Sequence, residues 1–337
     1  MEPEQPILIL GTGAMACLFA ARLAADGASV RMLGSWPDAL KALQTQGVRI
    51  VEADGSEYAY KVTATNNPEQ CIETHTALVL VKSWQTLRAT QQLETCLAVD
   101  GLALTLQNGL DNYPLLKAGL GSDRAALGVT TLGATLVEPG KVRIGGNGGI
   151  SLGKHDRLER IWGPLIGASF QVEVIADMDS LVWGKLVINA AINPLTALLR
   201  VPNGELLKKP AARVVMGILA REAAAVAAAQ GIQLPYPDPI SAAEEVARRT
   251  ASNYSSMLKD ILRGGPTEVD AINGAVVRVG RQINVLTPVN HILWQTVKSL
   301  ENGGELRFDM APTNFAKRRN RRTPGDQRVN LSTLQQP

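Results

Sequence analysis

The sequence predicts an α/β domain with a largely parallel sheet, followed by a second domain made of helices alone. Over the first half of the chain, short apolar runs alternate with helix-like segments, which is typical of strands joined by crossover helices. From Asp177 to about Leu300 the chain is instead rich in Ala, Leu and Val with helical periodicity. A length of 337 residues also favours two domains.

The first elements form a βαβ unit. A short apolar strand is expected at Pro6–Leu10 and a helix at Cys17–Ala24. Gly27 ends that helix, and Ser29–Leu33 reads as the second strand. Such a unit implies two parallel strands joined by a right-handed crossover.

The sheet continues along the chain. Apolar runs at Ala77–Val81 and Leu102–Leu106 predict two more strands, with a helix-like segment over Ser83–Leu97 between them. The β-rich and Gly-rich stretch Val129–Gly153 predicts antiparallel strands that complete the first domain.

The second half is expected to be helical, for example at Ala211–Gln230 and Ile240–Thr250, with a proline-rich segment between these two helices. The boundary between the two domains is placed near Ala176, where the composition becomes rich in Ala, Leu and Val. The predicted division is therefore an α/β domain at 1–176, a helical domain at 177–310 and a basic, disordered tail at 311–337.

The first strand is followed by Gly11-x-Gly13-x-x-Ala16, which departs from the dinucleotide-binding fingerprint only in its third position, where Ala is an accepted substitute. Between a buried strand and a helix, this pattern predicts a Rossmann-type domain whose helix N-terminus binds phosphates. The alternative is a Gly-rich turn that binds nothing. The residues expected to contact the cofactor are Gly11, Thr12, Gly13, Ala14, Met15 and Ala16.

The end of the second strand favours NADP over NAD. NAD-preferring sites usually place Asp or Glu there for the ribose hydroxyls, but this chain reads Met32-Leu33-Gly34-Ser35. Lys82, just after a predicted strand, and Arg31 can add positive charge for a 2′-phosphate. The alternative is that both are ordinary solvated basic residues.

Lys185, Asn189 and Asn193 lie four residues apart in a segment that is otherwise apolar or small. This spacing puts an ammonium and two carboxamides on one face of a buried helix. Unpaired, each would cost a few kcal/mol, so a polar small molecule in a cleft between the domains is the simplest partner. The alternative is a lysine that extends along the helix to solvent.

Composition limits the other classes of function. The odd number of cysteines and the scattered histidines have no metal-ligand spacing. The acidic N-terminus leads directly into a strand, which argues against a signal peptide. Polar residues interrupt the most apolar run before the roughly 20 residues that a bilayer crossing needs. We therefore expect a reduced, cytoplasmic, metal-free protein without a membrane partner.

The formal net charge of +3 is unevenly distributed. From Lys317 to the end, six basic side chains stand against Asp326, so the rest of the chain is slightly acidic. The basic run Lys317–Arg322 can be read as a nucleic-acid patch. We prefer a solvated, disordered tail, because the segment has few apolar residues, and expect no nucleic-acid partner.

Taken together, these motifs resemble the ketopantoate reductase (2-dehydropantoate 2-reductase) family over roughly residues 7 to 300. The run from Lys185 to Thr196 is the most specific. The matching pieces are Gly11-Thr12-Gly13-Ala14-Met15-Ala16, Val81-Lys82-Ser83-Trp84-Gln85, Gln107-Asn108-Gly109, Trp183-Gly184-Lys185-Leu186-Val187-Ile188-Asn189, Asn193-Pro194-Leu195-Thr196, Pro202-Asn203-Gly204-Glu205-Leu206, Ser255-Ser256-Met257-Leu258-Lys259-Asp260 and Thr267-Glu268-Val269-Asp270-Ala271-Ile272-Asn273-Gly274.

The resemblance implies reduction of 2-dehydropantoate to (R)-pantoate with NADPH, a step of pantothenate and coenzyme A biosynthesis. It implies that Lys185 is the general acid and Glu268 its partner in the site. Asn189 and Asn193 would bind the hydroxyl end of the substrate, with Ser256 near the carboxylate. Elementary chemistry agrees, because hydride addition to a ketone develops negative charge on oxygen, which an ammonium stabilises and protonates.

The resemblance assigns further contacts. Asn108 would bridge cofactor and substrate, Glu268 would also contact the cofactor, and Lys82 would lie near the adenosine phosphate. Asn203 matches another site position. One departure is that Ser35 stands where the family often has an arginine for the 2′-phosphate, so the preference for NADPH over NADH is expected to be weaker.

Two other functions remain open from sequence. A paralogue with the same fold can reduce a different 2-oxo acid, because pocket shape discriminates by only about 1–3 kcal/mol per methyl group. A catalytically silent NADP-binding sensor can keep the fold without the chemistry. The helical domain can also support a homodimer.

Overall fold

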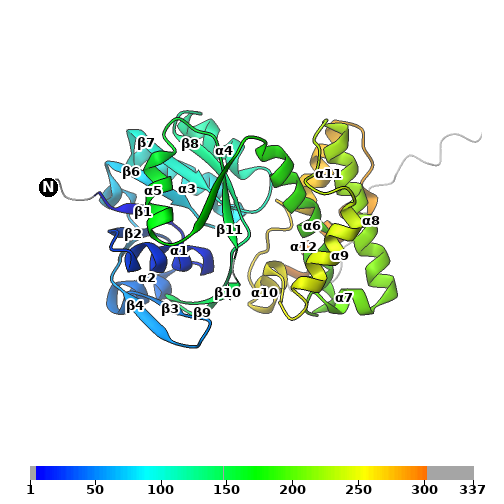
Figure 1. Ribbon diagram of the computed structural model, residues 1–337, viewed down its shortest axis with the longest axis horizontal. Coiled ribbons are helices and arrows are strands. Elements are labelled where there is room, and N and C mark those ends of the chain that lie inside the picture. Colours follow the sequence, from blue (N-terminus) through cyan, green and yellow to red (C-terminus); the bar gives the residue numbers. More distant parts are fainter. Residues whose placement is uncertain (1–4, 147, 302–337) are drawn as a thin grey trace, which may run out of the picture.

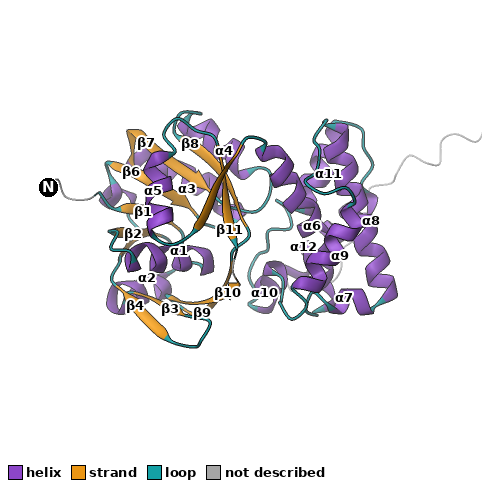
Figure 2. Cartoon of the chain, viewed as in Figure 1, coloured by secondary structure: helices purple, strands orange, loops and turns teal. Residues whose placement is uncertain are grey.

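A computed structural model describes residues 5–146 and 148–301, which form a sheet-containing half and a helical half lying side by side (Figures 1 and 2). The predicted tail at 311–337 lies outside the described residues, as do residues 302–310 of the predicted helical domain. The described residues confirm the predicted α/β fold followed by helices.

The larger sheet has eight strands among the described residues, in the order β12-β11-β8-β7-β6-β1-β2-β5. Neighbouring strands from β5 to β8 in this order pair in parallel, and β11 is antiparallel to β8. The strand bounds are Ile7–Leu10 (β1), Val30–Leu33 (β2), Thr63–Thr65 (β5), Thr74–Val79 (β6), Leu97–Thr105 (β7), Ala125–Thr130 (β8), Gly149–Gly153 (β11) and Gln171–Ile175 (β12).

A second sheet, with the order β4-β3-β10-β9, was not predicted. Its strands are Val48–Val51 (β3), Glu57–Tyr60 (β4), Gly133–Glu138 (β9) and Lys141–Gly146 (β10). The predicted antiparallel pairing within Val129–Gly153 is confirmed for β9 with β10 and for β11 with β8. Sequence periodicity did not reveal that β9 and β10 leave the main sheet to join β3, because that pairing joins segments about 90 residues apart in the chain.

Helices cover both faces of the main sheet (Figure 2). Successive residues of β1 point to opposite faces, so Ile7 and Ile9 pack in one core cluster, while Leu8 and Leu10 pack in another. All four are buried, as expected of a strand covered on both sides. The helices of this half are Ala14–Ala25 (α1), Pro37–Gln46 (α2), Thr86–Cys96 (α3), Asn112–Leu120 (α4) and Glu159–Gly167 (α5), with short 3-10 turns at Pro68–Cys71 (η1) and Ser83–Gln85 (η2).

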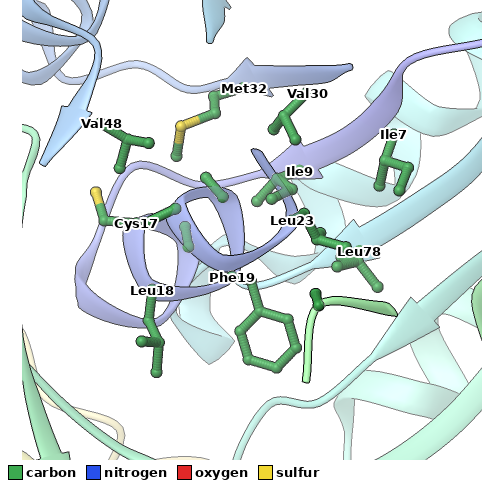
Figure 3. Packing of buried hydrophobic residues seen from close by; sticks show 14 of the residues in the cluster. Ile7, Ile9, Cys17, Leu18, Phe19, Leu23, Val30, Met32, Val48 and Leu78 are labelled. Atoms are coloured by element: carbon green, nitrogen blue, oxygen red, sulfur yellow. The ribbon is translucent and has the colours of Figure 1, made fainter. Parts of the chain in front are cut away.

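Helix α1 is held on the sheet by its apolar face (Figure 3). Phe19 stacks on Phe170 with ring centroids 4.6 Å apart. Leu18 and Leu23 are buried beside it, and each such side chain contributes about 1.5–3 kcal/mol on burial. This packing fixes the position of the α1 N-terminus.

The helical half is built around α6, which packs against α8, α9, α10 and α12. Its helices are Met178–Leu199 (α6), Glu205–Lys208 (α7), Pro210–Ala229 (α8), Pro239–Arg249 (α9), Ser256–Leu262 (α10), Asn273–Gln282 (α11) and Pro288–Glu301 (α12). Among the described residues, α6 is the one helix long and apolar enough to cross a membrane by length and composition. Most of it is buried by neighbouring helices, as in the core of a helical domain.

Candidate active site

A cavity of about 750 Å³ is lined by residues of both halves. From the sheet half come the loops that follow β1, β2, β6, β7 and β8, all of them parallel strands. From the helical half come α6, α10 and the segment around Glu268. In open α/β sheets, ligands bind outside the carboxyl ends of the strands, and this cavity lies there.

The glycine loop forms one wall of the cavity, which we call the glycine-loop wall (residues 11–15). Gly11 has φ +123° and a Cβ there would lie 3.0 Å from the Leu80 carbonyl oxygen, so only glycine fits without strain. Gly13 is the N-cap of α1 and a Cβ there would meet nothing within 4 Å. The α1 N-terminus, uncapped by any side chain, faces open space that suits the phosphates of a dinucleotide.

Lys185 projects from α6 into the same cavity, on the opposite side. The part-buried Nζ donates a hydrogen bond to the Thr130 carbonyl oxygen at the end of β8, at 2.7 Å. Withdrawal from water lowers the pKa of Lys185 to about 8, and the Glu268 carboxylate opposes that shift. An ammonium with a pKa this low is charged at neutral pH yet gives up its proton readily.

Asn189 and Asn193 line the cavity one and two turns after Lys185, and the three form the α6 wall. Asn193 is buried, and neither carboxamide has a side-chain hydrogen bond within the described part of the chain. Asn203 also lines the cavity. Its Nδ2 donates to Thr250 Oγ1 at 2.8 Å, and its buried Oδ1 has no partner among the described residues. Buried amides without partners are rare and point to a polar ligand.

The course of α6 depends on a proline inside the helix. Pro194 has no N–H, so the Ala190 carbonyl loses the donor that an ordinary helix would provide. Asn273 Nδ2 supplies the replacement at 3.0 Å and also donates to Asn290 Oδ1 at 2.9 Å. Asn273 and Asn290 are fully buried. This network supports α6 at the level of Asn193.

Glu268 is buried where the two halves meet. Its Oε1 accepts from the Ser83 backbone N–H at 3.1 Å, and its Oε2 accepts from Asn108 Nδ2 at 3.4 Å. Ser83 follows β6 and Asn108 follows β7, so this carboxylate ties the helical half to two strand ends. Within the described residues, Glu268 and Lys185 share no hydrogen bond. Their charges interact through space.

Lys82 forms ion pairs with two carboxylates across the cavity. Its Nζ lies 2.7 Å from Asp260 Oδ2 and 3.5 Å from Glu268 Oε2. Burial by itself would lower the pKa of Lys82, but the two carboxylates outweigh it and raise that pKa. Burial raises the pKa of Asp260, and Lys82 opposes the shift. Lys82 therefore stays cationic in the cleft.

Ser255 and Ser256 have different tasks. Ser255 caps α10, because its Oγ accepts from the Leu258 N–H at 3.1 Å, and it also accepts from Thr196 Oγ1 at 2.7 Å. Ser256 is free of the cap and lines the cavity. Because Ser255 is the cap, the hydroxyl of Ser256 is left available to a ligand.

The structure brings nearly all the predicted site residues to one cavity. Ala16 is an exception: it is fully buried in the core around α1, where it allows close packing of helix on sheet. Arg31 is another, because its guanidinium donates to the Gln70 carbonyl and does not line the cavity. The predicted residues that line the cavity are Gly11, Thr12, Gly13, Ala14, Met15, Ser35, Lys82, Asn108, Lys185, Asn189, Asn193, Asn203, Ser256 and Glu268.

Sequence reasoning missed several cavity residues. Asp260 lies four positions after Ser256, on the same face of α10, a spacing that could have identified it. Arg88 lies three positions after Gln85, about one helical turn, so the spacing could have identified it too. Thr130 gave no signal, because its contribution is a backbone carbonyl.

Within the described residues, no group of three or more His, Cys, Asp or Glu side chains could hold a metal ion. The glycine loop, the parallel strand ends and the opposing lysine define a dinucleotide-dependent oxidoreductase.

The comparisons with known proteins identify the family. Residues 7–157 match the family model described as ketopantoate reductase PanE/ApbA, and residues 177–301 match its C-terminal counterpart. The chain is 32% identical over 305 residues to the 2-dehydropantoate 2-reductase of Halobacterium salinarum, covering 88% of this chain and 99% of that protein. It is 35% identical to that of Archaeoglobus fulgidus, covering 89% and 99%. The chain belongs to the ketopantoate reductase family, whose members use NADPH.

Solved structures agree with this fold. A PanE/ApbA family ketopantoate reductase from Ralstonia eutropha superposes with a TM-score of 0.82 at 29% identity, over 88% of this chain and 99% of that one. A D-mandelate dehydrogenase bound to NADH and anilino(oxo)acetate superposes with a TM-score of 0.83 at 24% identity, over 88% and 98%. The second likeness concerns the fold alone.

Proposed function

We propose that this chain catalyses the NADPH-dependent reduction of 2-dehydropantoate to (R)-pantoate, a step of pantothenate and coenzyme A biosynthesis, with Lys185 as the general acid. The observation that carries the proposal is the α6 wall: an ammonium of lowered pKa and two unpaired carboxamides facing a glycine loop across one cavity. The names of the curated relatives supply the substrate.

When bound, NADPH supplies the hydride that reduces the keto carbon. The chain holds the proton that the keto oxygen needs. Lys185 Nζ has three N–H donors and uses one on the Thr130 carbonyl, so two remain for the substrate. The same ammonium stabilises the negative charge that develops on the keto oxygen and then transfers its proton there.

The remaining residues have positioning and binding roles in this proposal. Asn189 and Asn193 bind the hydroxyl end of the substrate through their unpaired carboxamides. Ser256 donates its hydroxyl to the substrate carboxylate. Asn203 offers its unpaired, buried Oδ1 to the ligand as an acceptor. The side chains of Asn189, Asn193 and Ser256 have no hydrogen bond within the described residues that would compete with a ligand.

Asn108 would contact both the cofactor and the substrate, and Glu268 orients Asn108 by accepting from its Nδ2. Glu268 also favours the charged form of Lys185 through space. Lys82, held in place by Asp260, would contribute positive charge to the adenosine phosphates.

We assign cofactor binding to residues 1–176 and most of the substrate contacts to residues 177–310, since the glycine loop lies in the first part and the α6 wall in the second. We also propose that the chain forms a homodimer through its helical half. We propose a cytoplasmic location, without nucleic-acid or membrane partners.

A paralogous specificity is the second candidate. A D-mandelate dehydrogenase shares this fold at a TM-score of 0.83, so the same scaffold also occurs in a dehydrogenase with another substrate. Pocket shape discriminates such substrates by only a few kcal/mol. A catalytically silent sensor is the third candidate. The presence of Lys185, Glu268, Gly11 and Gly13 in the sequence argues against it, because a protein without catalysis would not need all of them.

The test is NADPH oxidation with 2-dehydropantoate, measured beside smaller, larger and phenyl-bearing 2-oxo acids and repeated with NADH. We expect turnover of 2-dehydropantoate to exceed that of every other acid by at least about tenfold. Preferred turnover of another acid would assign the chain to the paralogous specificity. Cofactor binding without turnover of any acid would favour the sensor.

A further inference from the structure

One cavity-lining arginine, Arg88, has no hydrogen bond or ion pair within the described residues. Gly34, Ser35 and Trp36 line the cavity just after β2. Gln85 and Arg88 line it from η2 and α3, which follow β6. Because β2 and β6 both pair with β1, their ends lie two strand spacings apart, about 10 Å. In dinucleotide-binding domains, the adenosine passes beside the end of the second strand.

The β2 end itself provides no cation. A Cβ at Gly34 would lie 2.6 Å from Thr12 Cγ2, so a side chain there would require Thr12 to move. Ser35 offers only a neutral hydroxyl. Arg31 is turned away, with its guanidinium on the Gln70 carbonyl. A 2′-phosphate at this end therefore has to find its positive charge on another element.

Most cations of the cavity already have a partner within the protein. Lys82 pairs with carboxylates, Lys185 donates to a carbonyl, Lys259 donates to Thr135 Oγ1, and Arg263 donates to the Leu136 carbonyl. Arg88 alone, among the cavity-lining cations of the described residues, has no hydrogen bond or ion pair within them. It is exposed on α3 and so remains available to a ligand.

We propose that Arg88 is the residue that selects NADPH over NADH, by pairing its guanidinium with the 2′-phosphate while Ser35 donates its hydroxyl to the same group. The guanidinium fork matches a phosphate with two parallel N–H donors. In this proposal the selecting charge lies on α3 and not at the end of the second strand. The inference rests on the proposed use of NADPH and concerns this chain's own residues.

The test is calorimetric binding of adenosine 2′,5′-bisphosphate and of adenosine 5′-monophosphate to the full chain, which needs no turnover. The wild type is expected to bind the bisphosphate more tightly. Arg88→Ala should weaken bisphosphate binding about 10- to 100-fold and leave monophosphate binding unchanged. Arg88→Lys should fall between the two, because it keeps the charge but loses the fork.

Two further variants make the result specific. Arg221→Ala removes an exposed arginine of α8 outside the cavity and should leave both affinities unchanged. Adding Ser35→Arg to the Arg88→Ala protein returns a cation to the β2 end and should restore much of the bisphosphate affinity. Melting temperatures near that of the wild type would confirm that every variant is folded.

The outcomes separate this inference from the proposed function. If the wild type prefers the bisphosphate and Arg88→Ala keeps that preference, the role of Arg88 is wrong while NADPH use stands. If the wild type binds both nucleotides equally, both the role of Arg88 and the NADPH preference are wrong. Failure to reduce 2-dehydropantoate would overturn the substrate assignment and leave the binding ratios as they are.

Discussion

The two walls of the cavity differ in what they present to a ligand. The glycine-loop wall offers backbone N–H groups at a helix N-terminus and needs the absence of side chains. The α6 wall offers an ammonium and two carboxamides and needs those functional groups in helical register. The first wall recognises by shape and backbone, so adding an atom should damage it. The second recognises by side-chain chemistry, so removing a group should damage it.

The sharpest contrast is expected from Lys185→Ala. Removing the ammonium takes away the acid of the proposed reaction, and general acids contribute about 10²- to 10⁴-fold. We expect kcat for 2-dehydropantoate to fall by that factor, while the affinity for NADPH, measured by fluorescence titration, stays close to that of the wild type. Lys117→Ala, an exposed lysine on α4, is the matched control. A near-normal kcat for Lys185→Ala would exclude the assignment.

The glycine-loop wall is tested by two substitutions that add the same methyl group. Gly11→Ala forces an L side chain to φ +123°, with its Cβ 3.0 Å from the Leu80 carbonyl, and should cost about 1–3 kcal/mol of stability. Gly13→Ala has φ −83° and open space, so the fold should hold within about 1 kcal/mol. Urea unfolding measures both.

The same pair separates stability from binding. The methyl of Gly13→Ala points into the space assigned to the phosphates, so we expect NADPH affinity to fall at least about tenfold in a stably folded protein. Unchanged NADPH affinity in that variant would mean that the loop does not hold the pyrophosphate.

The support beneath the α6 wall is tested by Asn273→Ala. The substitution leaves the Ala190 carbonyl and Asn290 Oδ1 without their donor in a buried place, at a cost of about 1–3 kcal/mol in the free energy of unfolding. Asn66→Ala, at an exposed asparagine, should change stability by less than about 0.5 kcal/mol.

A second substitution tells whether the proline is the cause. Pro194→Ala returns a backbone N–H to position 194, so it should recover part of the stability lost in the Asn273→Ala protein. Purely additive effects in this double-mutant cycle would show that Asn273 does not compensate for the proline.

The α6 wall should also respond to pH in the unmodified protein. With the pKa of Lys185 lowered to about 8, the acid is protonated below that pH and loses its proton above it. The kcat/KM for reduction should therefore be level below pH 8 and fall about tenfold per pH unit above it. A profile that stays level to pH 10 would argue against a lowered pKa or against Lys185 as the acid.

Local patterns identified the individual elements because each depends on neighbouring residues. The short apolar run of β1, the glycine spacing before α1 and the four-residue spacing of Lys185, Asn189 and Asn193 are all set within one strand, turn or helix. The second sheet was missed, because β3 and β10 pair over a long separation that leaves no periodic trace.

The sequence by itself determined the fold class, the glycine loop and the polar face of α6, since backbone geometry converts each spacing into a direction. The tertiary structure alone decided the partners. The Lys185 ammonium meets the Thr130 carbonyl, Lys82 meets Asp260 from the other half, and Asn273 reaches the carbonyl that Pro194 leaves open. The physical reason is that partners depend on which distant segments pack together, and a pKa depends on the water and charge that this packing leaves around the group.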